Sequence, residues 1–312
     1  MVDIILPIYK SNKWLFETID SVIKQTYKDW HLIVIDDASK DGMLQKVEKK
    51  YGNHNNKISY IELEKNLRAA GARNYAIRQG KCNLIAFIDQ DDLWLPEKLE
   101  KQVYLFENKP DIGASHTDIK ILDENNTGKI IEDLIENYRR SEIDWEGSSK
   151  IEMAKIVFSS YPMRMATTMV RRDIYELIGG FNEKLFGSED IDLWLRISEK
   201  CKVGYVSEQL SIRRQHNLNV TKTYKHIRSK GYLNWVVSLR EDNAYSYLIP
   251  YIPIKEKALF ITTFKLAILK HNNLEAVRLA CKMIIKYPLD IKNHCRIVYY
   301  CFKSLLIHRP CR

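Results

Sequence analysis

Short apolar runs alternate with helix-length amphipathic stretches over about the first 125 residues. Four runs have the length and Val/Ile content of buried strands: residues 2–6, 31–36, 58–63 and 83–89. Apolar side chains recur at helical spacing between and after them, in residues 12–25, 41–50, 69–80 and 96–108. This alternation predicts an α/β fold with a mostly parallel sheet flanked by helices.

The pattern is weaker in the second part of the chain. Residues 126–160 are polar and weakly periodic, so we predict no defined element there, only a variable loop and helix segment over the site. The following segments predict a strand, a break, a helix and two strands, at residues 166–172, 179–180, 188–200, 202–206 and 210–216. The remaining residues read as helical.

The charge is distributed unevenly between two regions. Of the 49 Lys and Arg residues and 40 Asp and Glu residues, residues 223–312 hold 16 and 5. We therefore place a boundary near residue 222. Residues 1–222 are expected to form the catalytic domain, with nucleotide binding in about 1–125 and acceptor binding in about 126–222. Residues 223–312 are expected to form a basic helical extension.

Cysteine spacing and hydropathy bear on the environment of the protein. The six cysteines form no C-x-x-C pair and no spacing with His typical of zinc sites. No secretory leader is recognisable at the N-terminus. No run reaches the roughly 18 uncharged apolar residues of a membrane span. We expect a cytoplasmic protein.

An acidic segment follows the strand at 83–89. Asp89, Asp91 and Asp92 lie within four residues, and crowded carboxylates resist ionising together unless a cation compensates them. Oxygen ligands without nearby Cys or His favour Mg²⁺ or Mn²⁺ bound together with substrate phosphates. The alternative is an acidic N-terminal turn of the helix that begins near Pro96.

Acidic residues also follow the strand at 31–36. Asp36 and Asp37 stand at its end, where a carboxylate could accept a hydrogen bond from the imide N–H of a pyrimidine base. The alternative is a solvated loop. Ser39 and Asp41 are explained by capping of the next helix.

Two further clusters lie beyond residue 185. Glu189, Asp190 and Asp192 share one helical turn after Ser188; capping by Ser188 accounts for part of the pattern, and one carboxylate could act as a general base. Arg213, Arg214 and His216 end the last predicted strand. The arginines could pair with phosphate and the imidazole could bind a metal, or the histidine could be a structural residue.

Five segments, in this order and spacing, resemble family 2 glycosyltransferases: ILPIYK, SVIKQTYKDWHLIVIDDASKDG, NLRAAGARN, LIAFIDQDDLWLPEKL and IGGFNEKLFGSEDIDLWLRI. The resemblance covers residues 2–220 and implies a GT-A fold, a UDP-sugar donor and a divalent Mn²⁺ or Mg²⁺ ion. It implies roles for the following residues: Pro7, Tyr9 and Asp37 in the uracil pocket, Arg73 at the nucleotide, Asp89 near the ribose and metal, Asp91 on the metal, and Asp190 of the Glu189–Asp190 pair as the base.

The resemblance also implies the type of reaction. Attack of an acceptor hydroxyl on the anomeric carbon in one displacement inverts its configuration. A Gln-x-x-Arg-Trp motif, typical of processive members, is absent after Asp190, so one hexose or N-acetylhexosamine is expected per binding event. The expected product belongs to a bacterial surface polysaccharide. Lys10 and Arg68 depart from the asparagine and glycine common in the family.

Two other functions would be compatible with a similar set of acidic and strand-forming residues. A nucleotidyltransferase that makes sugar nucleotides would share the sheet and the acidic site, but the segment ILPIYKSNK lacks the expected glycine-rich loop. An inactive saccharide-binding relative would be expected to lose Asp91 or Asp190, and both are present.

The C-terminal extension contains an amphipathic stretch, residues 274–288. Apolar residues alternate there with a basic stripe of Arg278, Lys282 and Lys286. The helices could simply pack on the catalytic domain, or they could attach to the anionic inner face of a membrane that carries a lipid-linked acceptor. For membrane attachment we expect contributions from Leu274, Ile284, Lys303 and Leu305, and a folded fragment after removal of residues 273–312. We expect no nucleic-acid partner.

Overall fold

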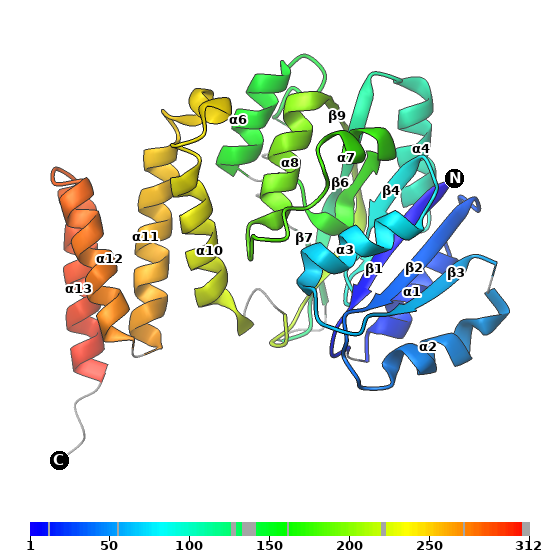
Figure 1. Ribbon diagram of the computed structural model, residues 1–312, viewed down its shortest axis with the longest axis horizontal. Helices are drawn as coiled ribbons and strands as arrows, with labels where there is room; N and C mark the ends of the chain where they lie inside the picture. Colours follow the sequence, from blue (N-terminus) through cyan, green and yellow to red (C-terminus); the bar gives the residue numbers. More distant parts are fainter. Residues whose placement is uncertain are drawn as a thin grey trace. The chain divides into compact units, whose positions relative to one another are not determined.

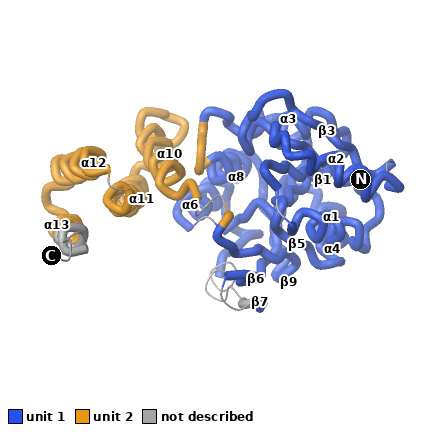
Figure 2. Tube along the Cα trace, turned by 90° about the horizontal axis from the view of Figure 1, so that it is seen from below, with its two compact units in different colours: residues 1–184, 189–217 blue, residues 185–188, 218–312 orange. Residues whose placement is uncertain are grey.

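The computed structural model describes residues 1–11, 13–54, 56–125, 129–132, 142–160, 162–219, 223–270 and 272–307, without the side chains of 131–132 and 302–307. The chain forms two compact units (Figure 2). The first unit comprises Met1–Lys184 and Glu189–Asn217. The second unit comprises Leu185–Ser188 and Leu218–Arg312.

The first part of the chain builds the parallel half of one sheet. Its strands are β1 (Val2–Ile8), β2 (Trp30–Asp36), β3 (Ile58–Glu62) and β4 (Leu84–Phe87), in the order β3-β2-β1-β4. The connecting and flanking helices are α1 (Leu15–Ile23), α2 (Met43–Tyr51), α3 (Arg68–Gln79) and α4 (Lys98–Asn108). Helix α3 covers one face of the sheet, and α1 and α4 cover the other (Figure 2). The predicted α/β fold is confirmed.

The sheet continues beyond β4 as a mixed sheet. The added strands are β5 (Leu93–Trp94), β6 (Ile112–Asp123), β7 (Lys129–Glu132), β8 (Thr168–Arg171) and β9 (Lys202–Gln215). The order runs β4-β8-β6-β9-β5, with β7 on β6, and only β6 and β9 are parallel in this half. The parallel pattern predicted from the sequence thus describes the first half of the sheet best.

The prediction of two strands at 202–206 and 210–216 is wrong. Strand β9 is continuous, but its register with β6 shifts where Thr117 faces Val206 and Asp118 faces Gln209. An irregularity of this kind absorbs the intervening polar residues without ending the strand. The sequence pattern alone marks the same residues as a break.

Three more helices complete the first unit (Figure 1). They are α6 (Lys150–Ser160), α7 (Arg172–Leu177) and α8 (Glu189–Lys200). The sequence predicted a variable loop and helix segment within 126–160 without assigning its elements, and β7 and α6 lie there; residues 126–128 and 133–141 lie outside the described residues. Helix α6 buries Met153, Val157 and Phe158 and packs on α8. Its low contrast between apolar and polar positions explains why its bounds could not be assigned from the sequence.

The second unit is helical, as predicted for the C-terminal extension. Its main helices are α10 (Lys225–Ser238), α11 (Ile252–Leu269), α12 (Asn273–Lys286) and α13 (Ile291–Ile307). Their shared core includes Leu233, Phe260, Phe264, Met283 and Ile297. Among the described residues, no helix is both long enough and apolar enough to cross a bilayer.

A buried carboxylate stabilises the second unit from within. Glu256 of α11 is fully buried and accepts hydrogen bonds from Arg240 (2.6 Å), Lys286 (2.7 Å) and the Tyr287 hydroxyl (2.5 Å). Burial alone would raise the pKa of Glu256, but these donors hold it below its ordinary value. Lys286, expected to face a membrane, is therefore bound inside its own unit.

Candidate active site

The acidic motifs lie on loops at the ends of parallel strands. Strand β1 leads into Tyr9, β2 ends at Asp36, and β4 is followed by the acidic segment 89–92. Because β1 pairs in parallel with both β2 and β4, these loops meet at one side of the sheet, here called the carboxyl edge. The fold therefore brings together the nucleotide and metal motifs predicted from the sequence.

Asp91 and His216 form a direct pair at the carboxyl edge. Nε2 of His216 lies 2.8 Å from Oδ2 of Asp91, and its ring stacks on Trp14 with 4.1 Å between centroids. The antiparallel pairing of β5 with the end of β9 brings these distant segments together. The result is a carboxylate oxygen, the ligand type that suits Mg²⁺ and Mn²⁺, beside a ring nitrogen of the kind that also binds metals.

Asp92 has a structural position beside this pair. It is buried and accepts a hydrogen bond from the main-chain N–H of Arg214 at 3.1 Å. Burial, together with the charges of Asp91 and Asp89, raises the pKa of Asp92 well above its ordinary value. The crowding of carboxylates inferred from the sequence is thus a property of this loop.

The two predicted arginines differ in their surroundings. Arg214 is buried, donates to the carbonyl oxygen of Asp91 at 3.1 Å and to Glu17 at 2.6 Å, and also pairs with Glu124. These bonds use its guanidinium to hold the acidic loop that contains Asp91. Arg213 is half-buried, and its charge partly offsets the raised pKa of Asp92. Of the two, Arg213 has the position better suited to meeting a phosphate.

Arg73 interacts both with Asp89, in the acidic loop after β4, and with Asp190, the predicted base. Its Nη2 lies 2.6 Å from Oδ1 of Asp89. Burial opposes its charge, but Asp89, Glu189 and Asp190 outweigh that effect and raise the pKa of Arg73. The buried guanidinium of Arg73 therefore interacts electrostatically with carboxylates of two motifs that lie more than 90 residues apart in the sequence.

Helix α8 is fixed to strand β4 by aromatic packing. Trp194 of α8 and Phe181 both meet Phe87 of β4 edge to face, with centroid distances of 6.0 and 5.7 Å. The first turn of α8 is thereby held near the end of β4. Within that turn Glu189 is buried, whereas Asp190 is half-buried and accepts from the N–H of Ile191 at 2.9 Å.

The remaining acid of this turn has a local role. Asp192 is bound by Arg196 one turn later, at 2.6 Å. The Oγ atom of Ser188 is buried without a hydrogen-bond partner among the described residues, so the predicted cap by Ser188 is wrong. The ion pair with Arg196 gives Asp192 a role in stabilising the helix. Glu189 and Asp190 therefore remain the candidates for the general base.

The predicted uracil pocket centres on Asp37, with Pro7 and Tyr9 on the neighbouring strand end. Asp37 is buried and accepts a 2.6 Å hydrogen bond from the N–H of Leu67. Burial raises the pKa of Asp37, aided by Asp36 and opposed by the N–H groups of Leu67 and Arg68. This carboxylate also orders the chain that enters α3.

Among the residues that the structure describes, four other than glycine adopt a left-handed backbone, and they lie at these loops. The set comprises Lys10 (φ 46°), Ala38 (φ 59°), Lys40 (φ 55°) and Arg68 (φ 61°). Only glycine, and to a lesser extent asparagine, adopts this conformation at low cost. The two departures from the family pattern thus fall where asparagine and glycine would relieve strain, and strain of this kind clusters at functional sites.

Gln90 was missed by the sequence analysis. Its side-chain amide accepts from the N–H of Tyr9 (3.0 Å) and from Ser11 Oγ (2.9 Å), and donates to the carbonyl of Tyr9 (3.2 Å). It therefore ties the loop of the uracil pocket to the acidic metal loop. The only sequence feature that could have indicated a role for Gln90 is its position between Asp89 and Asp91.

The arrangement suits a metal that is completed by substrate. Among the residues the structure describes, no group of three or more His, Cys, Asp or Glu side chains is arranged to hold an ion by itself. Asp91 and His216 place two donor atoms side by side, and Asp89 is bound to Arg73. Mg²⁺ and Mn²⁺ commonly take one or two carboxylates and complete their shell with phosphates and water. The residues present fit that mode.

Comparison with known proteins identifies similar sequences. The model of the family described as glycosyl transferase family 2 matches residues 3–178. The O-antigen biosynthesis glycosyltransferase WbnJ of Escherichia coli is 31% identical over 230 residues, which cover 72% of this chain and 83% of that protein. This chain spans 83% of the length of WbnJ but only 36% of an uncharacterized glycosyltransferase of Rickettsia bellii, which is 30% identical over 87% of this chain.

Two solved structures share this fold. Staphylococcus aureus TarS 1–349, in complex with UDP-GlcNAc, superimposes with a TM-score of 0.62 at 18% identity, covering 100% of this chain and 93% of that one. The mannosyltransferase PcManGT of Pyrobaculum calidifontis, in complex with GDP-Man and Mn²⁺, gives 0.61 at 16% identity, with 99% and 88% covered. At these identities the likeness establishes the fold.

Proposed function

Because this chain belongs to glycosyl transferase family 2 and has the GT-A fold, we propose that it transfers a single hexose or N-acetylhexosamine from a UDP-sugar to a saccharide acceptor. The transfer is metal-dependent, inverts the anomeric carbon, and serves the synthesis of a bacterial surface polysaccharide. The observation that carries this proposal is the position of Arg73. Its guanidinium binds Asp89 and also interacts electrostatically with Glu189 and Asp190.

The donor is held by residues of the carboxyl edge. Pro7, Tyr9 and Asp37 line the base, while Arg73 and Arg213 face the phosphates. Arg214, expected to pair with phosphate, acts instead through Asp91, whose loop it fixes. Gln90 keeps the two loops in register, so that base and phosphates are bound together.

The metal is held by Asp91 and His216, with Asp89 available if Arg73 turns toward a phosphate. A bound Mn²⁺ or Mg²⁺ ion neutralises the charge that develops on the departing UDP. Two ion pairs support this role: the buried Arg73 with Asp89, and His216 with Asp91, whose carboxylates lie on the same short loop.

Asp190 acts as the general base. It is half-buried and thus better able to reach an acceptor than Glu189, which is buried beside it. Asp190 removes the proton of the acceptor hydroxyl while the oxygen attacks the anomeric carbon and the bond to UDP breaks. Glu189 supports the charge of Arg73. A single displacement of this kind inverts the configuration.

We also infer that the second unit binds an anionic membrane surface from the cytoplasmic side, where a lipid-linked acceptor would be available. Helix α12 buries Ala276 and Met283 but leaves an opposite apolar face in solvent. That face is formed by Leu274, Val277, Cys281, Ile284 and Ile285, which fall on one side of a helix. Leu289, in the following loop, is 92% exposed.

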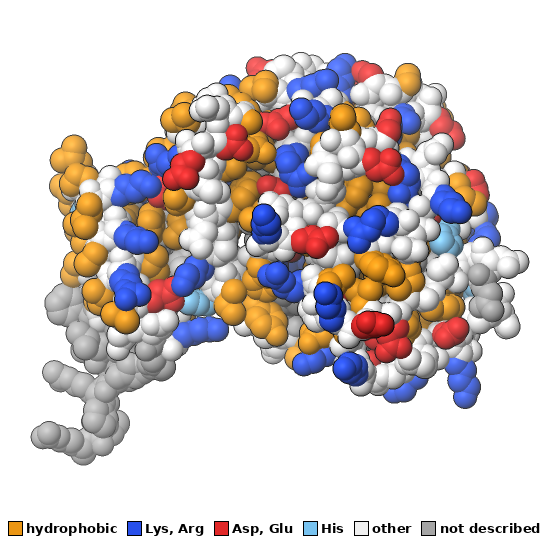
Figure 3. Space-filling view, viewed as in Figure 1, with side chains coloured by type: hydrophobic (Ala, Val, Ile, Leu, Met, Phe, Trp, Pro, Cys, Tyr) orange, Lys and Arg blue, Asp and Glu red, His pale blue; other side chains and the backbone are white. Residues whose placement is uncertain are grey.

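Basic residues border this apolar face. Arg278 and Lys282 are exposed on the adjoining side of α12, and Figure 3 shows basic and hydrophobic side chains side by side on the surface of this unit. Each such cation contributes about 1 kcal/mol near an anionic leaflet. Lys286 is excluded because it binds Glu256, and the side chains of Lys303 and Leu305 lie outside the described residues.

Point substitution tests the membrane proposal better than truncation. Removing residues 273–312 would take Ala276, Met283 and Ile297 out of the core of the second unit, so the fragment expected to stay folded would expose that core. In the full chain, Ile285→Ser with Leu289→Ser should reduce sedimentation with anionic vesicles several-fold. Leu177→Ser is the control, because Leu177 is 68% exposed in the first unit. Equal losses in both variants would refute the membrane surface.

A nucleotide-release screen tests the transfer itself. The full chain is incubated with Mn²⁺ and a panel of UDP-, GDP- and dTDP-sugars, and the released nucleotide is measured. Release from one or a few UDP-sugars is expected, with loss of activity on chelation. Release only from GDP- or dTDP-sugars would overturn the assignment of the donor, and no release from any of them would overturn the proposed activity.

A further inference from the structure

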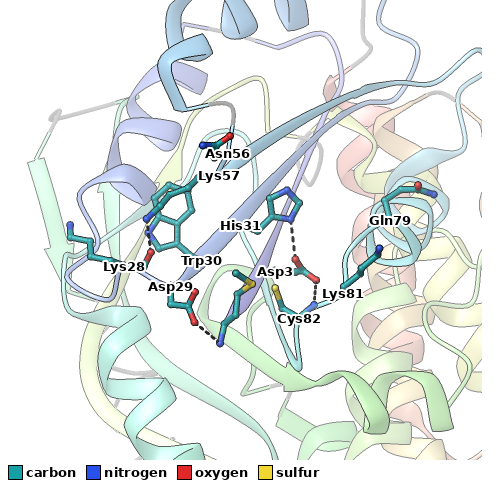
Figure 4. Close-up of a pocket in the computed structure, with 11 residues that line it drawn as sticks. Asp3, Lys28, Asp29, Trp30, His31, Asn56, Lys57, Gln79, Lys81 and Cys82 are labelled. Carbon is teal, nitrogen blue, oxygen red and sulfur yellow. Dashed lines mark hydrogen bonds and ion pairs between the residues drawn. The ribbon is translucent and has the colours of Figure 1, made fainter.

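A cavity of about 620 Å³ lies at the opposite side of the parallel strands (Figure 4). It is bordered by the first residues of β1 and β2 and by the segments that enter β3 and β4. Because these strands are parallel, this amino edge of the sheet is remote from the carboxyl edge, where the donor motifs lie. The volume is within the range of small-molecule sites.

Three lysines give the cavity a positive lining. Lys28 donates to the carbonyl oxygen of Gln25 and Lys57 to that of Lys28, each at 2.6 Å. Lys81 lines the opposite part of the cavity (Figure 4). None of the three forms an ion pair with a described carboxylate. Their charges are thus available to a ligand, and two of them are already held in place by main-chain oxygens.

The acidic residues of the cavity are already compensated. Asp3 is fully buried and bound by Arg172 at 2.6 Å and by the N–H of Cys82 at 2.8 Å. Nδ1 of His31 lies 3.1 Å from the same carboxylate. Asp29 pairs with the Met1 amino group at 3.1 Å. Neither carboxylate therefore neutralises the lysines.

Trp30 adds a donor without an acceptor. Its side chain lines the cavity and is only 4% exposed, and its Nε1 has no hydrogen-bond partner among the described residues. Lys57 lies over its ring at 5.1 Å. A buried N–H normally finds an acceptor, so Nε1 of Trp30 is a hydrogen-bond donor that remains unsatisfied beside the lysines.

We propose that this cavity is a second binding site, for a ligand that carries a phosphate group. Ammonium groups bind phosphate oxygens by charge-assisted hydrogen bonds, and the lining offers lysine donors in excess over free carboxylates. The ligand binds without the divalent ion that the donor site uses. The site is independent of the transfer reaction and does not require that reaction to be as proposed.

Calorimetric titration of the full chain in the presence of a chelator tests this site. The probes are inorganic phosphate, glucose 1-phosphate and dihexanoyl phosphatidic acid, which separate a free phosphate from a sugar phosphate and a lipid headgroup. The Lys57→Ala/Lys81→Ala variant should lose about tenfold or more in affinity for whichever probe binds. The control Lys46→Ala/Lys49→Ala removes two exposed lysines of α2 and should bind normally.

The Asp91→Asn variant separates this site from the donor site. Phosphate binding should be unchanged in it, because Asp91 lies at the carboxyl edge. The proposal fails if no probe binds the native chain, if both lysine pairs lower affinity equally, or if Asp91→Asn abolishes binding. Preference for one of the three probes identifies the source of the phosphate.

Discussion

The two units place charged and apolar side chains in opposite ways. In the first unit, carboxylates gather at the carboxyl edge; Asp37 and Asp92 are buried, but the side chains of Asp89 and Asp91 stay 40% and 17% exposed. In the second unit, the carboxylate of Glu256 is fully buried between two cations, while Ile285 is 79% exposed. Accessible acids suit a charged ligand and its metal, whereas exposed apolar side chains suit a surface that excludes water.

The largest effect is expected from Asp91→Asn. The variant loses a metal ligand, so turnover and Mn²⁺-dependent UDP affinity should fall below detection. Stability should hold or rise, because the charge of Asp91 is one cause of the raised pKa of buried Asp92. Calorimetry with UDP and Mn²⁺ measures the affinity, and Asp41→Asn, on an exposed loop, is the control. Unchanged affinity would remove Asp91 from the metal site.

Asp190→Asn should separate binding from catalysis. A general base contributes about 10² to 10⁴-fold in rate, so turnover should fall by that amount while donor affinity remains. Asp192→Asn is the matched control: it weakens the bond to Arg196 and should lower stability more than the turnover of the folded enzyme. If Asp190→Asn keeps more than about a tenth of the native rate, the base must be sought elsewhere.

Glu256→Gln should destabilise the second unit selectively. It leaves the half-buried Arg240 and the exposed Lys286 without their counter-charge, and solvent screening at both cations limits the expected loss to about 1 kcal/mol. Hydrogen exchange should rise in residues 252–286 while turnover on a soluble acceptor persists. Because the folded pKa of Glu256 is lowered, its stabilisation is present above its ordinary value of 4.5 and is lost as pH falls through the folded pKa. The variant should flatten this acid dependence; an unchanged acid dependence would contradict the role of Glu256.

The smallest effect is expected from Lys10→Asn. Asparagine tolerates the left-handed backbone of this position better than lysine, so the free energy of unfolding should rise by about 0.5 kcal/mol. Urea denaturation measures the change. Lys13→Asn is the control, because Lys13 is exposed and has no left-handed backbone. An equal gain in both variants would show that the strain at Lys10 is not its cause.

Much of the first unit could be predicted because its signals are local. Each parallel strand is one apolar run, and Asp37 and Asp91 follow such runs directly. Parallel neighbours place those ends at one edge by geometry. The bounds of helix α6 could not be assigned, because its apolar and polar positions have low contrast. The continuity of strand β9 was missed, because an irregularity in its pairing reads as a break.

Partners in space could not be predicted in the same way. The sequence predicted that Arg214 would bind phosphate and that Lys286 would face a membrane. In the structure, Arg214 binds Glu17 and Glu124, and Lys286 binds Glu256. Nothing in the sequence indicated a role for Gln90 except its position between two acidic residues. In the structure its side chain links the loop after β1 to the loop after β4. Such bonds depend on long-range packing, which local periodicity does not encode.

The sequence by itself determined the family, the α/β alternation, the position of the acidic motifs and the basic helical extension, because periodicity, strand-end chemistry and motif order are properties of neighbouring residues. Only the tertiary structure decided which charged groups face each other. The pairing of β5 with β9 joined Asp91 to His216, and the packing of α8 on β4 brought Glu189 and Asp190 into the field of Arg73. Electrostatic energy depends on distance in space, and folding sets that distance independently of separation along the chain.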